Sequence, residues 1–194
     1  MNIPTIRSTT TADEDAAVSA VVLAFATDPV ARWCWPDPQA YLASMPMFIR
    51  AFVGRAFRHD GAFCSADHAA AALWLLPGVS PDEEALGQVI EDTIAKAVAS
   101  DLHTAFEQMA GHHPTEPHWY LPAIGVDPAY QGRGYGGALM SYALERCDRE
   151  GVPAYLESSN PRNISLYKRH GFATVGQVQV GNSPTIVPMV RPAR

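Results

Sequence analysis

The chain has 194 residues, 47% of them hydrophobic, and these values predict one globular domain over 1–194 with a sizeable core. Its formal net charge of −6 argues against a nucleic-acid partner, because proteins that bind duplexes normally present a basic face. The first 19 residues contain no apolar signal core, and no run reaches the ~20 apolar residues of a membrane span. We therefore expect a cytoplasmic protein with no membrane partner.

The chain contains three cysteines: Cys34, Cys64 and Cys147. They are far apart and odd in number, so we expect small buried side chains and no disulfide framework. His112, His113 and His118 lie in or just beyond the loop "GHHPTEP". Adjacent histidines in one loop rarely converge as the three or four ligands of a metal ion, so we predict no metal site.

The N-terminal segment 5–28 predicts a short strand, a polar turn and a helix. Thr11 or Asp13 could cap this helix, acidic residues occupy its first turn, and the pair Asp28-Pro29 ends it. The next stretch, "VARWCWPDPQ" (30–39), is predicted to be an aromatic loop broken by prolines.

Further elements follow as far as residue 111. Residues 39–61 predict a helix in which Pro46 produces a kink or a break. Residues 61–78 predict an antiparallel hairpin joined around Asp67. Proline and acidic residues from Pro81 to Glu84 predict the start of another helix, and a second helical stretch runs through 101–111.

The C-terminal part alternates strands and helices. The expected elements are a strand over 118–128, a loop and helix over 131–151, a strand over 152–158, a short helix over 159–171 and a final hairpin over 172–191. No repeat or low-complexity segment interrupts them.

The stretch "QGRGYGG" (131–137) contains four glycines and precedes an amphipathic helix. A helix N-terminus offers unpaired N–H donors and partial positive charge, and glycines let a ligand approach the backbone. The pattern predicts an anion cradle in which the N–H groups near Gly134 and Gly136 reach phosphate oxygens. The alternative is a tight turn that binds no ligand.

A dinucleotide site is a second interpretation of the same loop. Gly132, Gly134 and Gly137 spell GxGxxG, and Glu157 follows about twenty residues later. However, "DPAYQ" separates the loop from its strand, and too few residues follow Glu157 for further βαβ units. A nucleotide-dependent oxidoreductase stays open only as a minor alternative.

Two motifs are similar to known signatures. "IGVDPAYQGRGYGGALM" resembles the acetyl-CoA signature of the GNAT superfamily of N-acetyltransferases, and "NPRNISLYKRHGF" resembles its second signature. The matching residues are Gln131, Gly134, Gly136, Asn160, Tyr167, Gly171 and Phe172. Both stretches are most similar to puromycin N-acetyltransferase-like members. The resemblance implies an α/β GNAT fold: a mixed, mostly antiparallel twisted sheet of about seven strands, helices on both faces, and a splay between the fourth and fifth strands.

The resemblance also implies where acetyl-CoA or coenzyme A binds. The strand end at Ile124 pairs with the pantetheine arm and its N–H polarises the acetyl carbonyl, while residues 132–137 hold the diphosphate. The implied cofactor-binding residues are Ile124, Gly125, Val126, Gln131, Gly132, Arg133, Gly134, Tyr135, Gly136, Gly137, Asn160, Asn163 and Tyr167. Asn160 can equally act as a helix cap before Pro161. Arg162, Lys168 and Arg169 could contact the 3′-phosphate or be merely solvated.

Two residues are the catalytic candidates. Tyr167 is expected to protonate the departing thiolate, although it could simply pack in the core. Glu157, at a strand end, is the expected base for the amine and contributes to substrate binding, and His118 is the second choice. A surface acid without a role is the alternative for Glu157. The resemblance implies direct attack, with no covalent enzyme intermediate.

These motifs predict an acetyl-CoA-dependent N-acetyltransferase for a small-molecule amine, active as a monomer or homodimer. Residues 117–191 would form the acetyl-CoA core and 1–110 the acceptor side. There Trp33 and Trp35 are expected to bind substrate, and Tyr41 and Phe48 to complete an aromatic wall, unless these rings are ordinary core. Two alternatives stay open: a CoA-binding sensor or scaffold without turnover, and acetylation of a protein or peptide amine.

Overall fold

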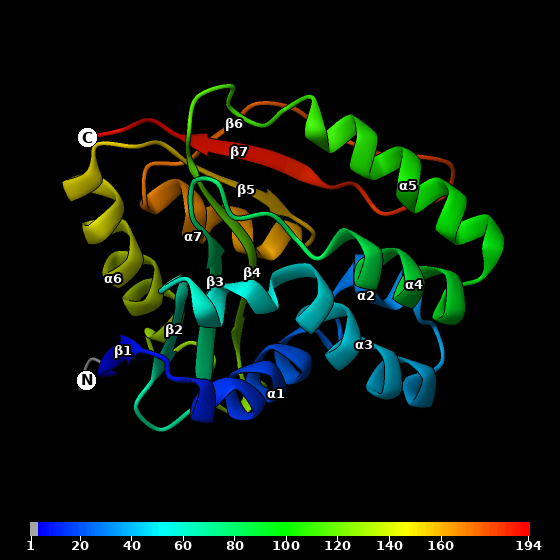
Figure 1. The fold of residues 1–194 in the computed structure, drawn as a ribbon, viewed down its shortest axis with the longest axis horizontal. Coiled ribbons are helices and arrows are strands. Elements are labelled where there is room, and N and C mark those ends of the chain that lie inside the picture. The colour runs from blue at the N-terminus through cyan, green and yellow to red at the C-terminus, as the bar shows by residue number, and fades with distance from the viewer. Residues whose placement is uncertain (1–3) are drawn as a thin grey trace.

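A computed structural model describes residues 4–194 and contains one seven-stranded sheet (Figure 1). Its strands are β1 (Ile6–Ser8), β2 (Ala62–Ser65), β3 (Ala70–Leu75), β4 (Trp119–Val126), β5 (Ala154–Ser158), β6 (Ala173–Thr174) and β7 (Val187–Arg191). They are ordered β1-β2-β3-β4-β5-β7-β6, and among these pairs only β4 and β5 are parallel. The predicted mixed, mostly antiparallel sheet is confirmed.

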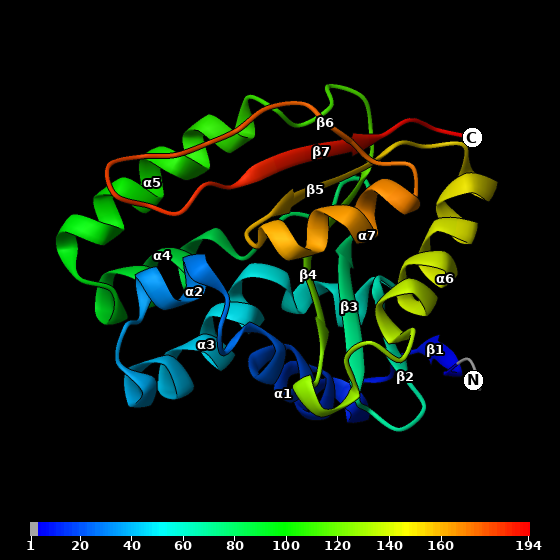
Figure 2. The same cartoon turned by 180° about the vertical axis from the view of Figure 1, so that it is seen from behind.

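Helices cover both faces of the sheet (Figures 1 and 2). They are α1 (Glu14–Phe25), α2 (Pro29–Cys34), α3 (Pro38–Val53), α4 (Glu83–Thr93), α5 (Lys96–Ala110), α6 (Tyr135–Glu150) and α7 (Ile164–Arg169). Helices α1 to α5 pack into one buried cluster, and α6 and α7 pack into another. Strand β3 is buried along its whole length because its side chains pack alternately into the two clusters, Leu73 into the first and Trp74 into the second.

The prediction of a loop over 30–39 is wrong, because α2 occupies 30–34 and α3 begins at Pro38. Asp28 begins that helix: its Oδ1 accepts hydrogen bonds from the N–H groups of Val30 (3.0 Å) and Ala31 (3.1 Å), and Pro29 takes the first helical position. The aspartate-proline pair therefore starts α2 three residues after the last residue of α1. The predicted break at Pro46 does not occur, since α3 continues through it.

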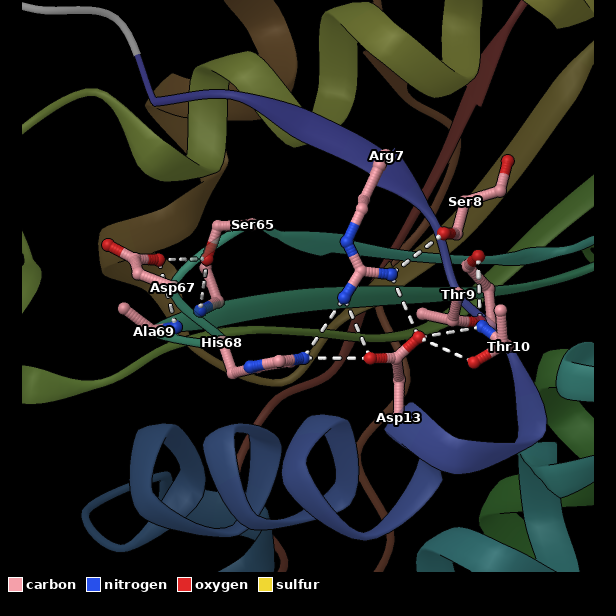
Figure 3. A network of polar contacts seen from close by, with 11 residues as sticks. Arg7, Ser8, Thr9, Thr10, Asp13, Ser65, Asp67, His68 and Ala69 are labelled. Carbon is pink, nitrogen blue, oxygen red and sulfur yellow. Dashed lines mark hydrogen bonds and ion pairs between the residues drawn. The ribbon is translucent and has the colours of Figure 1, made fainter.

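Asp13 lies at the start of α1, but its carboxylate turns away from the helix (Figure 3). It accepts from both terminal nitrogens of Arg7 (2.8 and 2.7 Å) and from the N–H of Thr10 (2.8 Å), and lies 2.8 Å from His68 Nε2. The hydrogen bonds from Arg7, and then that from Thr10, hold the pKa of Asp13 far below its usual range. Asp13, one of the two predicted caps, thus joins β1, α1 and the β2–β3 hairpin.

The predicted splay between β4 and β5 is confirmed. The two strands pair only from Trp119–Leu121 against Ala154–Leu156, and β4 then continues to Val126 alongside β3 alone. Both views show the two strands leaving one another with α7 beside the fork (Figures 1 and 2).

A β-bulge explains where the strands separate. Leu75 pairs with Tyr120 and Leu73 pairs with Ala123, so β4 contains one more residue than β3 between these pairs. A bulge bends its strand and increases its twist. Pro122 lies within the bulge and has no N–H to donate to a neighbouring strand. The bend therefore falls where pairing with β5 ends.

The predictions about the hairpins and the cysteines agree with the structure. The hairpins β2–β3 and β6–β7 are antiparallel, and Cys34, Cys64 and Cys147 are free and buried. Between residues 4 and 194, no helix is both long enough and apolar enough to cross a membrane.

Candidate functional site

A cleft of about 530 Å³ opens where β4 and β5 separate. Every residue predicted to bind the cofactor lines it, with the exception of Arg133. The walls come from the end of β4, the loop 130–137 with the start of α6, the segment 160–169, and residues 24–28 after α1. Four segments that are distant in sequence thus converge on one cleft.

The glycine loop leaves the first turn of α6 uncapped. Gly134 is the N-cap, has a φ of 90°, and offers no side chain to accept the helix N–H groups. Gly132 also has a positive φ of 74°, and a β-carbon at either position would meet no atom within 4 Å. The start of α6 thus combines N–H groups without a side-chain cap and a loop with room beside it, as an anion cradle requires.

The splayed edge of β4 offers further backbone groups. The N–H of Asp127 donates to Ala69 at the end of β3, so by alternation the backbone groups of Ile124 and Val126 point toward the splay. Gln131 Nε2 donates to the carbonyl of Val126 (3.1 Å), which fixes the loop against this edge. The N–H of Ile124 is thus free of β3 and directed into the cleft.

The remaining residues of the predicted phosphate region differ in position. The Arg133 guanidinium lies 5.4 Å from the ring centre of Tyr130 and does not line the cleft, whereas Arg162 and Arg169 do. Asn160 caps the short turn Pro161–Asn163 by accepting from the N–H of Arg162 (3.1 Å), and it also lines the cleft. The predicted cap is confirmed, and its contact with a cofactor stays a prediction.

Tyr167 is 5% exposed, packs in the core at an edge to Phe172, and lines the cleft. Burial raises the pKa of its hydroxyl, and the charge of Asp28 raises it further, against an opposing hydrogen bond with Asn163. Because the hydroxyl stays protonated at neutral pH, Tyr167 can donate a proton into the cleft. Core packing and a position at the cleft are therefore compatible.

A second, largely apolar cavity of about 110 Å³ adjoins the cleft. Rings and aliphatic side chains of α1, α2, α3 and α5 line it, including Phe25, Val30, Trp35, Met45, Phe48, Ile49, Phe52 and Phe106. Trp35 and Phe48 were predicted for such a wall. Trp33 does not line the cavity but donates to Asn182 Oδ1 (3.1 Å), and Tyr41 is buried with its hydroxyl on the Val22 carbonyl (2.6 Å).

Asp28 was not predicted as a site residue, yet it borders both the cleft and the apolar cavity. It is 4% exposed, its Oδ2 accepts from the Ser159 hydroxyl (2.7 Å), and burial raises the pKa of its carboxyl. In the sequence the aspartate-proline pair indicates only a helix boundary, so sequence alone provided no reason to expect a site here. Phe25 is the other residue that lines both spaces.

Glu157 extends from β5 with a side chain only 8% exposed, which does not fit a surface acid. It lines the apolar cavity and also an outer cleft of about 810 Å³. Its Oε1 lies 3.2 Å from His113 Nε2. The pKa values of Tyr120 and Tyr155 are raised, first by burial and then by the charge of Glu157 and hydrogen bonding to it.

A group of three potential metal ligands occurs elsewhere: Asp13, Cys64 and His68 offer atoms within 4.8 Å of one another. Both carboxylate oxygens of Asp13 already accept hydrogen bonds from the Arg7 guanidinium. A metal ion would have to displace this cation, so the group is better explained as the network that anchors β1 (Figure 3).

Comparison with known sequences gives consistent matches. The profile of the "Acetyltransferase (GNAT) family" matches residues 33–172. A mycothiol acetyltransferase of Propionibacterium freudenreichii subsp. shermanii is 28% identical over 82% of this chain and 52% of its own length. The N-alpha-acetyltransferase RimI of Mycobacterium tuberculosis is 46% identical over 32% of this chain and 40% of its own. An uncharacterized N-acetyltransferase of Schizosaccharomyces pombe is 37% identical over 37% of this chain and 29% of its own. The chain thus spans about half or less of these relatives.

Solved structures share the fold at low sequence identity. A histone acetyltransferase HPA2 and related acetyltransferase from Corynebacterium glutamicum has a TM-score of 0.71 at 24% identity, covering 100% of this chain and 98% of that one. Arylalkylamine N-acetyltransferase 2 from Aedes aegypti has a TM-score of 0.69 at 11% sequence identity, covering 100% of both chains. A chain of the NatC complex bound to Gag peptide and CoA has a TM-score of 0.57 at 12% sequence identity, again covering 100% of both chains.

Proposed function

Because the chain belongs to the acetyltransferase (GNAT) family, whose members use acetyl-CoA, we propose that it acetylates the amine of a small molecule with an apolar body. One observation carries this proposal: the cleft with the glycine cradle and the apolar cavity meet at Phe25 and Asp28. A donor bound in the cleft and an acceptor bound in the cavity would come together at that border.

Acetyl-CoA supplies an acetyl group activated as a thioester, and the cleft residues fit its parts. The N–H groups at the start of α6 bind the diphosphate, and glycines at 132 and 134 leave room for it. The N–H of Ile124 binds the acetyl oxygen and stabilises the charge that develops there. Asn160 and Asn163 contact the pantetheine arm. Positive charge for the 3′-phosphate comes from Arg162 and Arg169, which line the cleft.

Three side chains serve the chemistry. Tyr167 donates its proton to the leaving sulfur, and Glu157 accepts a proton from the amine. Asp28, buried and bonded to Ser159, adds negative charge at the border that favours an ammonium group. Trp35 packs against the acceptor, and Trp33 stays a prediction as a substrate contact. In this division 1–110 supplies most of the acceptor wall and 117–191 the cofactor core of a single domain.

The apolar lining of the cavity favours amines that carry an aryl or alkyl group over polyamines, whose second charge would be desolvated there. The resemblance to puromycin N-acetyltransferase-like members stays a prediction, as do the cytoplasmic location and a monomeric or homodimeric state. The open outer cleft favours a second candidate, acetylation of a peptide amine, because an extended chain could occupy it.

The test is a panel of amines incubated with acetyl-CoA, with release of free thiol as the readout. Arylalkylamines are expected to be acetylated faster than polyamines and N-terminal peptides. Tyr167→Phe should lower kcat about 100-fold, as for loss of a general acid, with CoA affinity unchanged. Turnover of peptides alone would favour the second candidate. Tight CoA binding with no turnover of any amine would instead favour a CoA-binding sensor or scaffold.

A further inference from the structure

The loop between α5 and β4 places two histidines in line with Glu157. Glu157 Oε1 lies 3.2 Å from His113 Nε2, His113 Nδ1 lies 3.0 Å from His118 Nε2, and His118 Nδ1 lies 2.9 Å from the carbonyl oxygen of Glu116. Each imidazole uses both ring nitrogens. The result is a continuous series of polar contacts, one ion pair and two hydrogen bonds, from a carboxylate at the apolar cavity to the outer cleft.

The carbonyl oxygen of Glu116, at the outer end of this series, determines which ring nitrogens carry hydrogen. A carbonyl oxygen only accepts, so His118 Nδ1 must carry a hydrogen. A neutral His118 then accepts at Nε2, and His113 must donate from Nδ1. A neutral His113 has no second hydrogen for Glu157, so one additional proton is required. It can reside on Glu157, His113 or His118 without loss of any of the three contacts.

The surroundings hold this series in place. The His113 ring lies 4.0 Å from the ring of Tyr155 and 4.8 Å from that of Tyr120, centre to centre. The Tyr155 hydroxyl donates to the carbonyl of Met109 (3.4 Å), and the outer cleft adds the acidic residues Glu83 and Glu116. Glu157 faces the inner cavity, whereas His113 and His118 line only the outer cleft.

We propose that Glu157, His113 and His118 form a relay that carries the amine's proton from the apolar cavity to the outer cleft. This inference rests on the proposed function and adds His113 and His118 as positioning residues that act through Glu157. The direction follows from the geometry, because an amine seated in the cavity would touch the carboxylate and be separated from solvent.

The proton balance of one turnover is closed. Glu157 takes one proton from the substrate ammonium and passes one to His113 Nε2, and His113 passes one from Nδ1 to His118 Nε2. His118 then releases its Nδ1 proton to a water molecule that replaces the Glu116 carbonyl as the partner of that nitrogen. Tyr167 gives its proton to sulfur as the C–S bond breaks. The second N–H proton released as the C–N bond forms replaces the one that Tyr167 lost. One proton per turnover therefore leaves through the relay.

The kinetic test compares His113→Gln and His118→Ala with His112→Asn, a change in the same loop outside the series. With an alkylamine that is protonated at neutral pH, both relay variants should lower kcat about 100-fold, within the usual contribution of a general base. With a fluorinated amine that is already neutral, the loss should disappear, and KM and CoA affinity should stay unchanged. Equal losses with both amines, or an equal loss in His112→Asn, would overturn the relay.

A second measurement needs no turnover. Nitrogen NMR signals of the His118 ring should move when Glu157 is replaced by Gln, although the two side chains do not touch, because they share one proton. Unchanged His118 signals would refute the shared proton. If the wild-type protein binds CoA but acetylates no amine, the proposed function fails, while these signals still decide whether the three groups are linked.

Discussion

The cofactor cleft and the apolar cavity are built in different ways. The cleft is formed largely by backbone: N–H groups of the loop 132–137 and the free edge of β4. The cavity is formed by side chains from α1, α2, α3 and α5, which are brought together only by packing. Phe25 and Asp28 belong to both. A backbone site depends on local conformation and tolerates varied side chains, whereas a side-chain site changes with each substitution.

The largest expected effect tests the backbone half of this comparison. Gly134→Asp places a carboxylate in the cradle, and juxtaposed like charges cost several kcal/mol, so CoA should bind about 1,000-fold more weakly in calorimetric titration.

The matched control for that variant is Gly151→Asp at the other end of α6. Gly151 has a φ of 64° and open space around it, so the strain of substitution is comparable. A carboxylate at the helix C-terminus also interacts unfavourably with the helix dipole, so Gly151→Asp should destabilise α6 more than Gly134→Asp does. Unaltered affinity in Gly134→Asp, or equal loss in Gly151→Asp, would contradict the cradle.

An intermediate effect, on the KM of the amine substrate, is expected from a change in the apolar cavity. Phe106→Ala removes one ring of the cavity, which also packs at 6.0 Å from Phe52. The KM for an arylalkylamine should rise about 10-fold, the equivalent of ~1.4 kcal/mol of lost apolar contact, with CoA affinity unchanged. A short alkylamine serves as the internal control and should be affected less. If Phe106→Ala instead lowered the affinity for CoA, the cleft and the apolar cavity would not act independently.

The smallest effect concerns the pH dependence of folding at two carboxylates, Asp148 on the helix that follows the glycine loop and Asp28 at the border of the cleft and the cavity. Arg191 bonds Asp148 of α6 through two nitrogens (2.6 and 2.8 Å) and lowers its pKa, whereas burial raises the pKa of Asp28. Asp148 thus adds stability above its unfolded pKa and loses it as pH falls through the folded one. Asp28 favours folding while protonated, and loses that contribution as pH rises through its raised pKa.

The corresponding variants should therefore show opposite trends. From about pH 3 to about pH 7, the destabilisation by Asp148→Asn should grow and that by Asp28→Asn should shrink, since ordinary carboxyls titrate in this range. For Asp148, a partly exposed pair, the change should be below about 1 kcal/mol. Denaturant titration across this range measures both, and parallel trends would contradict the assignment.

The sequence by itself determined most of the elements and the residues of the glycine-loop cleft, because both depend on neighbouring residues. Glycines followed at once by an amphipathic helix predict an uncapped N-terminus, and the predicted cleft residues apart from Arg133 line one space. Prediction from sequence failed where a local signal fits either the end or the start of a helix. Asp28-Pro29 was interpreted as the end of α1, and the aromatic stretch after it was predicted to be a loop, whereas the pair begins α2.

Only the tertiary structure decided the apolar cavity. Phe25, Phe48 and Phe106 belong to three different helices, and nothing in their spacing indicates one cavity. His113 meets Glu157 because the α5–β4 loop folds over the sheet, a contact between residues that no local periodicity relates. Contacts of this kind follow from how α5 and β5 pack together, and packing depends on the whole chain rather than on any one segment.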